Sequence, residues 1–343
     1  MNRRLVIILS AVAVVIVVVG VLLSIAVRKQ NQKQPTAAVF QVKKVLDEAV
    51  ISPVASFDNN AIWYFNSEGR LFRINTDGSG LSEFPLPALS SGLLNRVLWP
   101  KTGSDFMAIV GSGSNEIKNY YNSAQKIYIN LPANIQSIDW MPDSQRVVYI
   151  WKSGDNMHQQ LVMANADGTG FTAIKDVFWP DLVVKAGNDG KTVLLYRSGI
   201  QGDSNKVYYA NLDTGVIATA VDSGKTISAQ WLPVGSRFVF AQISLTAYPK
   251  LYLYDFTNHQ AVDLSLNTTL DKITFDSDGK YMYAAVPKKD NSGDIFVKVD
   301  LTSFKQETYF EPDQNISATR LFLAGSQLYF VNSQDQKLYT ISK

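Results

Sequence analysis

The feature that most constrains the fold is a short segment that recurs along the chain at intervals of 41 to 47 residues. In its clearest copy, WMPDSQRVVYIW at residues 140–151, a tryptophan precedes a polar turn and an apolar strand. A period in the forties built from short strands and polar turns is typical of propeller blades. We align the copies on the residue before each turn, which gives Phe57, Trp99, Trp140, Lys185, Trp231, Phe275 and Phe322.

A second recurring element follows the first. Segments such as QLVMAN at residues 160–165 and KVYYAN at residues 206–211 alternate apolar and polar residues and are rich in β-branched and aromatic side chains, which predicts strands. Turns containing glycine follow several of them, and a further short strand comes next. The pattern predicts an all-β fold: a seven-bladed β-propeller of four-stranded antiparallel blades over residues 39–343. The large apolar residues before the turns are expected to pack between blades.

The last copy lacks a fourth strand, because too few residues follow Lys337. The segment VFQVKKV, residues 39–45, lies before the first copy and has the composition of a strand. We expect residues 39–45 to pair with the last blade, which would close the ring and leave no open sheet edge.

The N-terminal segment differs from the rest of the chain. Residues 5–27 contain no charged side chain and would form a helix about 35 Å long, enough to cross a hydrocarbon core of about 30 Å. The sequence predicts a short tail at 1–4, a transmembrane helix at 5–27 and a polar tether at 28–38. A cleaved signal peptide, cut after the small residues 24–26, is the alternative. We expect a single-pass membrane protein with its propeller on the extracytoplasmic side, although basic residues flank both ends of the span and leave its orientation open.

Charge and composition exclude several classes of function. The whole chain carries +2 at neutral pH, and residues 1–38 hold five basic and no acidic residues, so residues 39–343 carry +2 − 5 = −3. A mildly acidic domain argues against a nucleic-acid partner. The sequence has no cysteine, which excludes disulfides, a thiolate nucleophile and zinc sites with cysteine ligands.

The turn sequences resemble those of a known family. WMPDSQRVVYI, together with TDGSG at residues 76–80 and ADGTG at residues 166–170, is similar to the WD-like repeats of TolB-type propellers. The resemblance implies a propeller fold from about residue 50 to the C-terminus and is weak for function, since the same repeat occurs in TolB and in non-catalytic propellers of some peptidases. The chain departs from the family pattern at Met141, at Val234 and at Lys185.

Motifs for catalysis and metal binding are absent from the sequence. The chain has two histidines, no nucleophile elbow and no paired histidine motif. GSGSN at residues 111–115 lies between two predicted strands and is expected to be a hairpin loop. DSDG at residues 276–279 resembles the start of a calcium loop, but it occupies the repeated turn and lacks the later glutamate. We therefore predict no cofactor, no metal and no enzymatic activity.

Variation among the copies points to one face of the propeller. The loops between second and third strands differ most in sequence, and antiparallel order places them on the same face as the connections between blades. Function on a scaffold is often carried by such loops. We expect a non-catalytic module that binds a protein or a cell-envelope polymer there; the alternatives are a propeller-face enzyme acting on glycans and an accessory subunit of a separate catalytic chain. The candidate binding residues are Asp155, His158, Phe178, Trp179, Asp203, Tyr248, Lys288 and Lys289.

Overall fold

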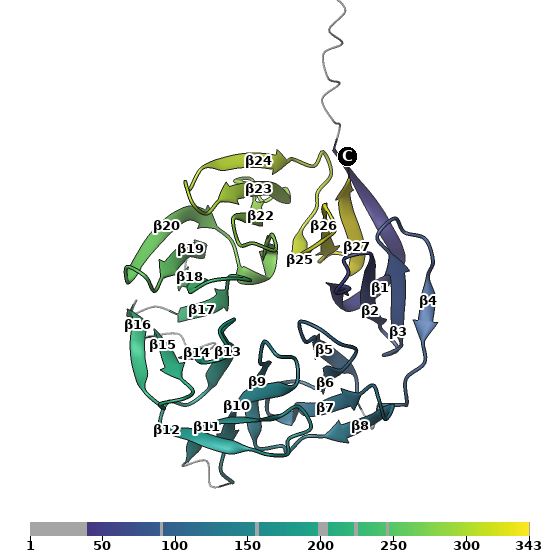
Figure 1. Cartoon of the computed structure of the whole chain (residues 1–343). Coiled ribbons are helices and arrows are strands. Elements are labelled where there is room, and N and C mark those ends of the chain that lie inside the picture. The colour runs from purple at the N-terminus through teal and green to yellow at the C-terminus, as the bar shows by residue number, and fades with distance from the viewer. Residues whose placement is uncertain are drawn as a thin grey trace, which may run out of the picture. The chain divides into compact units, whose positions relative to one another are not determined.

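The computed structural model describes residues 40–89, 92–154, 158–197, 205–222, 226–244 and 247–342. Almost all of these residues belong to one compact unit, Gln41–Ser342. Within it the strands form antiparallel sheets that follow one another around a common centre, as Figure 1 shows. The described part of the chain is therefore all-β, as predicted, and is consistent with a β-propeller.

Five of the sheets have four strands each, in the order of the sequence. The first comprises β5 (Leu94–Leu98), β6 (Phe106–Val110), β7 (Ile117–Asn122) and β8 (Ile127–Asn130). The second comprises β9 (Ile135–Trp140), β10 (Arg146–Lys152), β11 (Gln159–Asn165) and β12 (Thr172–Val177). The third comprises β13 (Leu182–Ala186), β14 (Thr192–Arg197), β15 (Lys206–Asn211) and β16 (Ile217–Asp222). The fourth comprises β17 (Thr226–Trp231), β18 (Arg237–Ser244), β19 (Ala247–Asp255) and β20 (Gln260–Asn267). The fifth comprises β21 (Ile273–Phe275), β22 (Tyr281–Pro287), β23 (Asp294–Asp300) and β24 (Gln306–Phe310).

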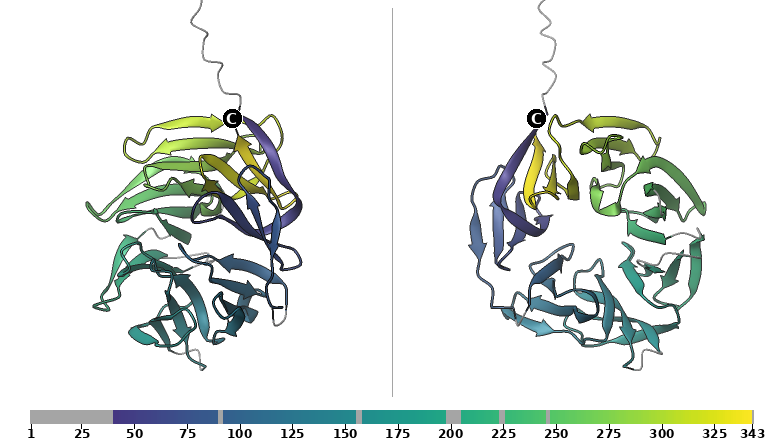
Figure 2. Two further views of the ribbon diagram at one scale, coloured as in Figure 1. Left: turned by 45° about the vertical axis from the view of Figure 1, so that its right-hand side comes forward. Right: turned by 180° about the vertical axis from the view of Figure 1, so that it is seen from behind.

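The sixth sheet has seven strands and contains both ends of the compact unit. Its order is β25 (Ala318–Ala324), β26 (Gln327–Asn332), β27 (Lys337–Ser342), β1 (Gln41–Ala55), β2 (Ala61–Asn66), β3 (Leu71–Asn75) and β4 (Ser82–Phe84). The long strand β1 is shared: Gln41 to Lys44 pair with β27, whereas Val50 to Ala55 pair with β2. Figures 1 and 2 show β1 in purple beside β27 in yellow. The predicted count of seven blades and the predicted domain boundaries stay predictions.

The strand register corrects the alignment of two weaker sequence copies. Trp140 is the last residue of β9 and pairs with Val147 of β10. In each other sheet, the residue that takes the same place in the strand pairing is the residue before the turn. In the first and fourth copies the residues at this position are Ala55 and Ala186, which end β1 and β13. Phe57 and Lys185 were therefore misaligned, and Phe57 lies in the turn with 76% of its surface exposed. Low similarity in these two turns explains the error, because composition alone does not determine register.

Tryptophans before the turns join neighbouring sheets, as well as filling space between them. The indole N–H of Trp99 donates to the backbone carbonyl of Ser52 at 2.8 Å, and that of Trp140 donates to Leu98 at 2.9 Å. Trp231 repeats the contact with the carbonyl of Lys185 at 3.1 Å. Each bond links an inner strand to the inner strand of the preceding sheet. A buried tryptophan usually needs such a partner for its N–H.

The turns that carried the family resemblance have one repeated geometry. Gly78 and Gly168 have φ of 86° and 83°, a backbone region that glycine adopts without strain. One residue before each glycine, a carboxylate caps the turn: Asp77 Oδ1 accepts the backbone N–H of Ser79 at 2.8 Å. Asp167 makes the equivalent contact with Thr169 at 2.9 Å. These aspartates are therefore structural turn residues.

The helices of the described residues are short. They are the 3-10 turns η1 (Gly113–Asn115) and η2 (Leu270–Lys272), each about 6 Å long, against the 30 Å or so of a hydrocarbon core. Within the described ranges, no helix has the length and apolar character needed to cross a membrane. This finding contradicts the predicted localisation as a single-pass membrane protein, which we withdraw. The predicted span at 5–27, with its flanks at 1–4 and 28–38, lies outside the described residues.

Candidate functional site

A polar pocket of about 580 Å³ opens between the sheets β5–β8 and β9–β12. Four connections build it: the β6–β7 loop, the β8–β9 connection, the β10–β11 loop and the β12–β13 connection. They lie on the face where sequence variation predicted the binding site. The lining residues are Gly113, Glu116, Lys118, Ala133, Asn134, Ile135, Gln136, Lys152, Ser153, Gly154 and Asp181.

A carboxylate held between two cations lies at this pocket. The guanidinium of Arg96 forms two hydrogen bonds with Glu116, one of them from Nη2 to Oε2 at 3.1 Å. The ammonium of Lys118 lies 3.6 Å from the same Oε2. Glu116 and Lys118 are 13% and 5% exposed, whereas Arg96 is 42% exposed. Both carboxylate oxygens of Glu116 are thus engaged by ion contacts.

Lys118 occupies a position that the other sheets use for the apolar core. By strand register it is equivalent to Leu161, Val207 and Phe296, each of which is completely buried. Burial lowers the pKa of the Lys118 ammonium, and the nearby charge of Arg96 lowers it further, while Glu116 opposes both effects. A lysine whose pKa is lowered holds a larger neutral fraction near pH 7, and neutral amines are proton acceptors.

The opposite rim of the pocket is fixed by hydrogen bonds. The side-chain amide of Asn134 donates to the carbonyl of Lys152 at 2.7 Å, and the N–H of Lys152 donates back to the carbonyl of Asn134 at 2.9 Å. The amide of Gln136 donates to Asp181 Oδ1 at 3.2 Å. Two lysines, Lys118 and Lys152, and a second acidic residue, Asp181, thus line the pocket. Hydrogen bonds hold Lys152 and Asp181 in place.

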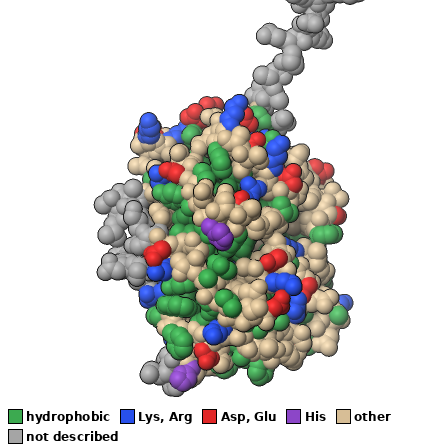
Figure 3. Space-filling model, turned by 60° about the vertical axis from the view of Figure 1, so that its left-hand side comes forward, with side chains coloured by type: hydrophobic (Ala, Val, Ile, Leu, Met, Phe, Trp, Pro, Cys, Tyr) green, Lys and Arg blue, Asp and Glu red, His purple; other side chains and the backbone are tan. Residues whose placement is uncertain are grey.

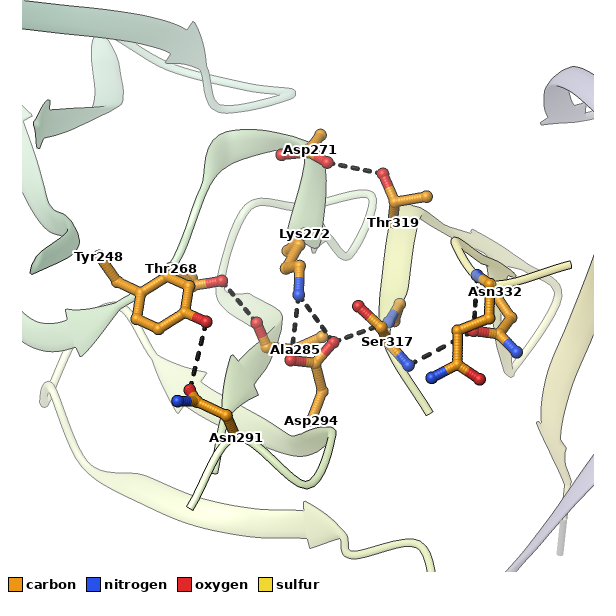
Figure 4. Close-up of polar contacts among 12 residues, drawn as sticks. Tyr248, Thr268, Asp271, Lys272, Ala285, Asn291, Asp294, Ser317, Thr319 and Asn332 are labelled. Atoms are coloured by element: carbon orange, nitrogen blue, oxygen red, sulfur yellow. Dashed lines mark hydrogen bonds and ion pairs between the residues drawn. The ribbon is translucent and has the colours of Figure 1, made fainter. Parts of the chain in front are cut away.

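An equivalent ion pair in another sheet provides an internal comparison (Figure 4). Lys272 and Asp294 stand at the register positions of Arg96 and Glu116, and their charged atoms approach to 2.8 Å. They are only 16% and 2% exposed, and Asp294 also accepts the backbone N–H of Ala318 at 2.7 Å. That pair lies within one sheet, is enclosed by protein, and is joined to the next sheet through Ala318. The pair at Arg96 instead borders a pocket and has a second cation, Lys118.

One group of the predicted binding residues lies beside this pocket. His158 donates its backbone N–H to Ser153, a lining residue, at 3.1 Å. Phe178, at the start of the β12–β13 connection, is 82% exposed. Trp179 stacks on Tyr208 with ring centroids 4.4 Å apart, so its ring packs against its own sheet.

A second group lies in the sheets β17–β20 and β21–β24. The hydroxyl of Tyr248 donates to Asn291 at 3.4 Å (Figure 4). This bond links Tyr248 to the loop that carries Lys288 and the exposed Lys289. Lys288 itself pairs with Glu311 at 3.3 Å. None of the six described candidates lines the pocket, and Asp155 and Asp203 lie outside the described residues. Their role in binding stays a prediction.

Sequence reasoning missed Arg96, Glu116 and Lys118. The signal was nevertheless present, because EIKNYYN at residues 116–122 places two charged residues where the other third strands begin with at most one and continue with apolar residues. Charged side chains at a buried strand position are rarely found without a partner or a function. Their convergence with Lys152 and Asp181 depends on neighbouring sheets and was not readable from one strand.

Metal binding finds no support in the described ranges. They contain no group of three or more histidine, aspartate or glutamate side chains that could hold a metal ion. On the face shown in Figure 3, acidic and basic side chains are interspersed.

Comparison with known proteins finds similarity only to solved structures. No family model matches the sequence, and no curated protein matches it. Among solved structures, an oligogalacturonate lyase in complex with manganese has a TM-score of 0.64 at 13% identity, covering 90% of this chain and 94% of that one. An oligogalacturonate lyase from Vibrio parahaemolyticus has the same TM-score and coverage at 10% identity. The chain shares their fold. TolB from Acinetobacter baumannii, at 12% identity and covering 89% of this chain and 80% of that one, has a TM-score of 0.46, which is too low to support any conclusion.

These relatives contradict the prediction that the chain is not an enzyme, because the fold carries a lyase in both proteins. The prediction relied on missing nucleophile and metal motifs, and a site built from a lysine base needs neither. The described residues of this chain do not fit the manganese of the first relative, since they offer no cluster of metal ligands.

Proposed function

We propose that this chain is an enzyme that acts on acidic glycans at the pocket beside Arg96, Glu116 and Lys118. The observation that carries the proposal is the buried lysine at a core position of the repeat, next to a carboxylate and open to a polar pocket. A concave site with a titratable group of perturbed pKa is the usual form of an active site. The lyase activity named for the structural relatives agrees with it.

The reaction that suits these groups is β-elimination from a uronic acid residue. Lys152, which lines the pocket, neutralises the substrate carboxylate, which makes the adjacent C–H more acidic. The neutral amine of Lys118 removes that proton, the electron pair forms a C=C bond, and the C–O bond to the neighbouring sugar breaks. The departing oxygen takes a proton from solvent. Glu116 contacts Lys118 and orients it.

Glycosidic hydrolysis fits the pocket less well. It requires one carboxyl group that is protonated and can donate to the leaving oxygen, together with a second carboxylate. Arg96 and Lys118 engage both carboxylate oxygens of Glu116, so neither oxygen is free to donate to a leaving oxygen. The proposed chemistry is therefore elimination.

The exposed ring of Phe178 extends the proposed site. It lies three residues before Asp181, which lines the pocket, and 82% of its surface is open. An apolar ring at a pocket rim offers a flat surface for the C–H face of a sugar. We propose that a glycan chain leaving the pocket passes over Phe178, which agrees with the envelope-polymer ligand expected from the sequence.

The test is lyase activity on oligogalacturonate, followed by the ultraviolet absorbance of the unsaturated product. We expect Lys118→Met to lower kcat by about 100-fold or more, the usual contribution of a general base. Lys175→Met, on the exposed strand β12, is the matched control and should retain activity. Phe178→Ala should raise KM and leave kcat unchanged. If wild type produces no unsaturated product from any of a panel of uronate glycans, the proposal is wrong.

A further inference from the structure

A second pocket lies at the opposite ends of the strands from the proposed active site. It has a volume of about 550 Å³ and opens between the sheets β13–β16 and β17–β20. The β13–β14 turn and the β17–β18 turn form two of its sides. No residue that lines the proposed active site lines this pocket, so the two can be tested separately.

Three aromatic rings form the walls of this second pocket. The rings of Tyr209 and Phe256 are nearly perpendicular, at 81° with centroids 5.1 Å apart. Trp231 lies nearly parallel to Phe256, at 22° and 5.7 Å. The indole N–H of Trp231 is used by the carbonyl of Lys185, and the backbone N–H of Phe256 donates to Ser236 at 3.2 Å. The rings are thus held in place before any ligand binds.

The pocket has a fixed negative charge. Asp189 accepts hydrogen bonds from the backbone N–H of Thr192 at 2.8 Å and from its hydroxyl at 2.7 Å. Burial raises the pKa of Asp189, but these bonds and that of the Lys191 N–H outweigh it and hold the pKa below its usual value. The described lining residues include no lysine, arginine or histidine. Among the lining side chains a cation would therefore meet one carboxylate and no basic group; the nearest described ammonium contact is that of Lys101 with Asn188, at 2.5 Å.

Aromatic faces around a carboxylate are suited to one class of ligand. The face of an aromatic ring attracts a cation, and methylated ammonium groups add apolar contact that an ordinary ammonium lacks. We propose that the pocket formed by Asp189, Tyr209, Trp231 and Phe256 binds an organic cation that carries a methylated ammonium group. This binding is independent of the proposed lyase reaction.

Calorimetric titration of the full-length chain with choline tests the proposal. The comparison ligand is the neutral isostere of choline, in which a tert-butyl group replaces the trimethylammonium group with almost the same shape. We expect choline to bind about tenfold or more tightly than the isostere, because cation–π attraction contributes about 1–2 kcal/mol in a partly desolvated site. Equal affinities for the two ligands, or no binding of choline, would overturn the proposal.

Variants locate the site. Phe256→Leu and Asp189→Asn should each weaken choline binding by about fivefold or more, while binding of the isostere changes less for Asp189→Asn. The matched controls are Phe171→Leu and Asp167→Asn. Phe171 is an exposed ring beside another turn, and Asp167 caps that turn. Thermal melting confirms that each variant is folded. Unchanged choline affinity in both folded test variants places the ligand elsewhere and refutes the assignment. The wild-type comparison of choline with its isostere decides the question even if a variant fails to fold.

Discussion

The enclosed ion pair of Lys272 and Asp294 gives a stability prediction whose size follows from the contacts. Asp294 is 2% exposed, and its carboxylate oxygens lie 3.0 and 2.8 Å from the Lys272 ammonium. It also accepts the N–H of Ala318 at 2.7 Å, a bond between two sheets. Asp294→Ala leaves an ammonium that is 16% exposed without its partner, and an N–H without its acceptor.

Removing one member of a buried pair costs about 3–5 kcal/mol, and an orphaned buried N–H costs about 1–3 kcal/mol. The two costs overlap because the same carboxylate supplies both contacts. We therefore expect Asp294→Ala to lower the free energy of unfolding by about 4 kcal/mol, measured by urea denaturation followed by circular dichroism. Glu307→Ala breaks the exposed pair with Lys298, whose atoms are 4.0 Å apart, and should cost less than about 1 kcal/mol.

A double variant separates the charge from the hydrogen bond. Lys272→Met in the Asp294→Ala background removes the unpaired ammonium and should recover about half of the lost stability. A loss of under about 1 kcal/mol for Asp294→Ala alone would refute the reasoning, because it would mean that solvent reaches this pair as freely as a surface pair.

Three further predictions follow from the site and from the joints between sheets. The rate of the proposed reaction should rise with pH towards the lowered pKa of Lys118 and level off above it, since only the neutral amine accepts a proton; a rate that falls over that range in a pH profile contradicts the assigned base. Trp140→Phe should lower the free energy of unfolding by about 1–2 kcal/mol, because the carbonyl of Leu98 loses its donor; an unchanged urea midpoint would show that the bond contributes nothing. Removing residues 1–46 should lower the melting temperature well below that of a chain lacking residues 1–38, because only the first deletion uncovers the edge of β27; equal melting temperatures would show that this pairing contributes no stability.

The sequence was informative about the parts of the fold that depend on local patterns. Strand alternation, glycine turns and the spacing of Trp99, Trp140 and Trp231 predicted antiparallel sheets in the observed order. The strand register was predicted less accurately. The first copy was misaligned by two residues and the fourth by one, because Ala55 and Ala186 carry no distinctive side chain.

The candidate site was predicted only as a face. The loops carrying His158 and Phe178 do lie on the face that holds the pocket, but the groups that could perform chemistry are on strands. Arg96 and Lys118 come from β5 and β7, and Lys152 comes from the next sheet. Their meeting depends on how two sheets pack, which one sequence does not specify. The prediction of no enzymatic activity failed for the same reason, because it searched for contiguous motifs.

The sharing of β1 between the two ends of the compact unit has a consequence for the order of folding. Residues 41–44 pair with residues 339–342, so this contact joins the first and last strands of the unit. During synthesis, β2 is available to β1 early, whereas β27 emerges last. Contacts between such distant segments form slowly, and an unpaired edge is prone to join another chain meanwhile. The first part of β1, with Lys43 and Lys44 on an otherwise β-prone run, therefore waits unpaired while nearly the whole chain is made, and its two lysines discourage pairing with the wrong strand.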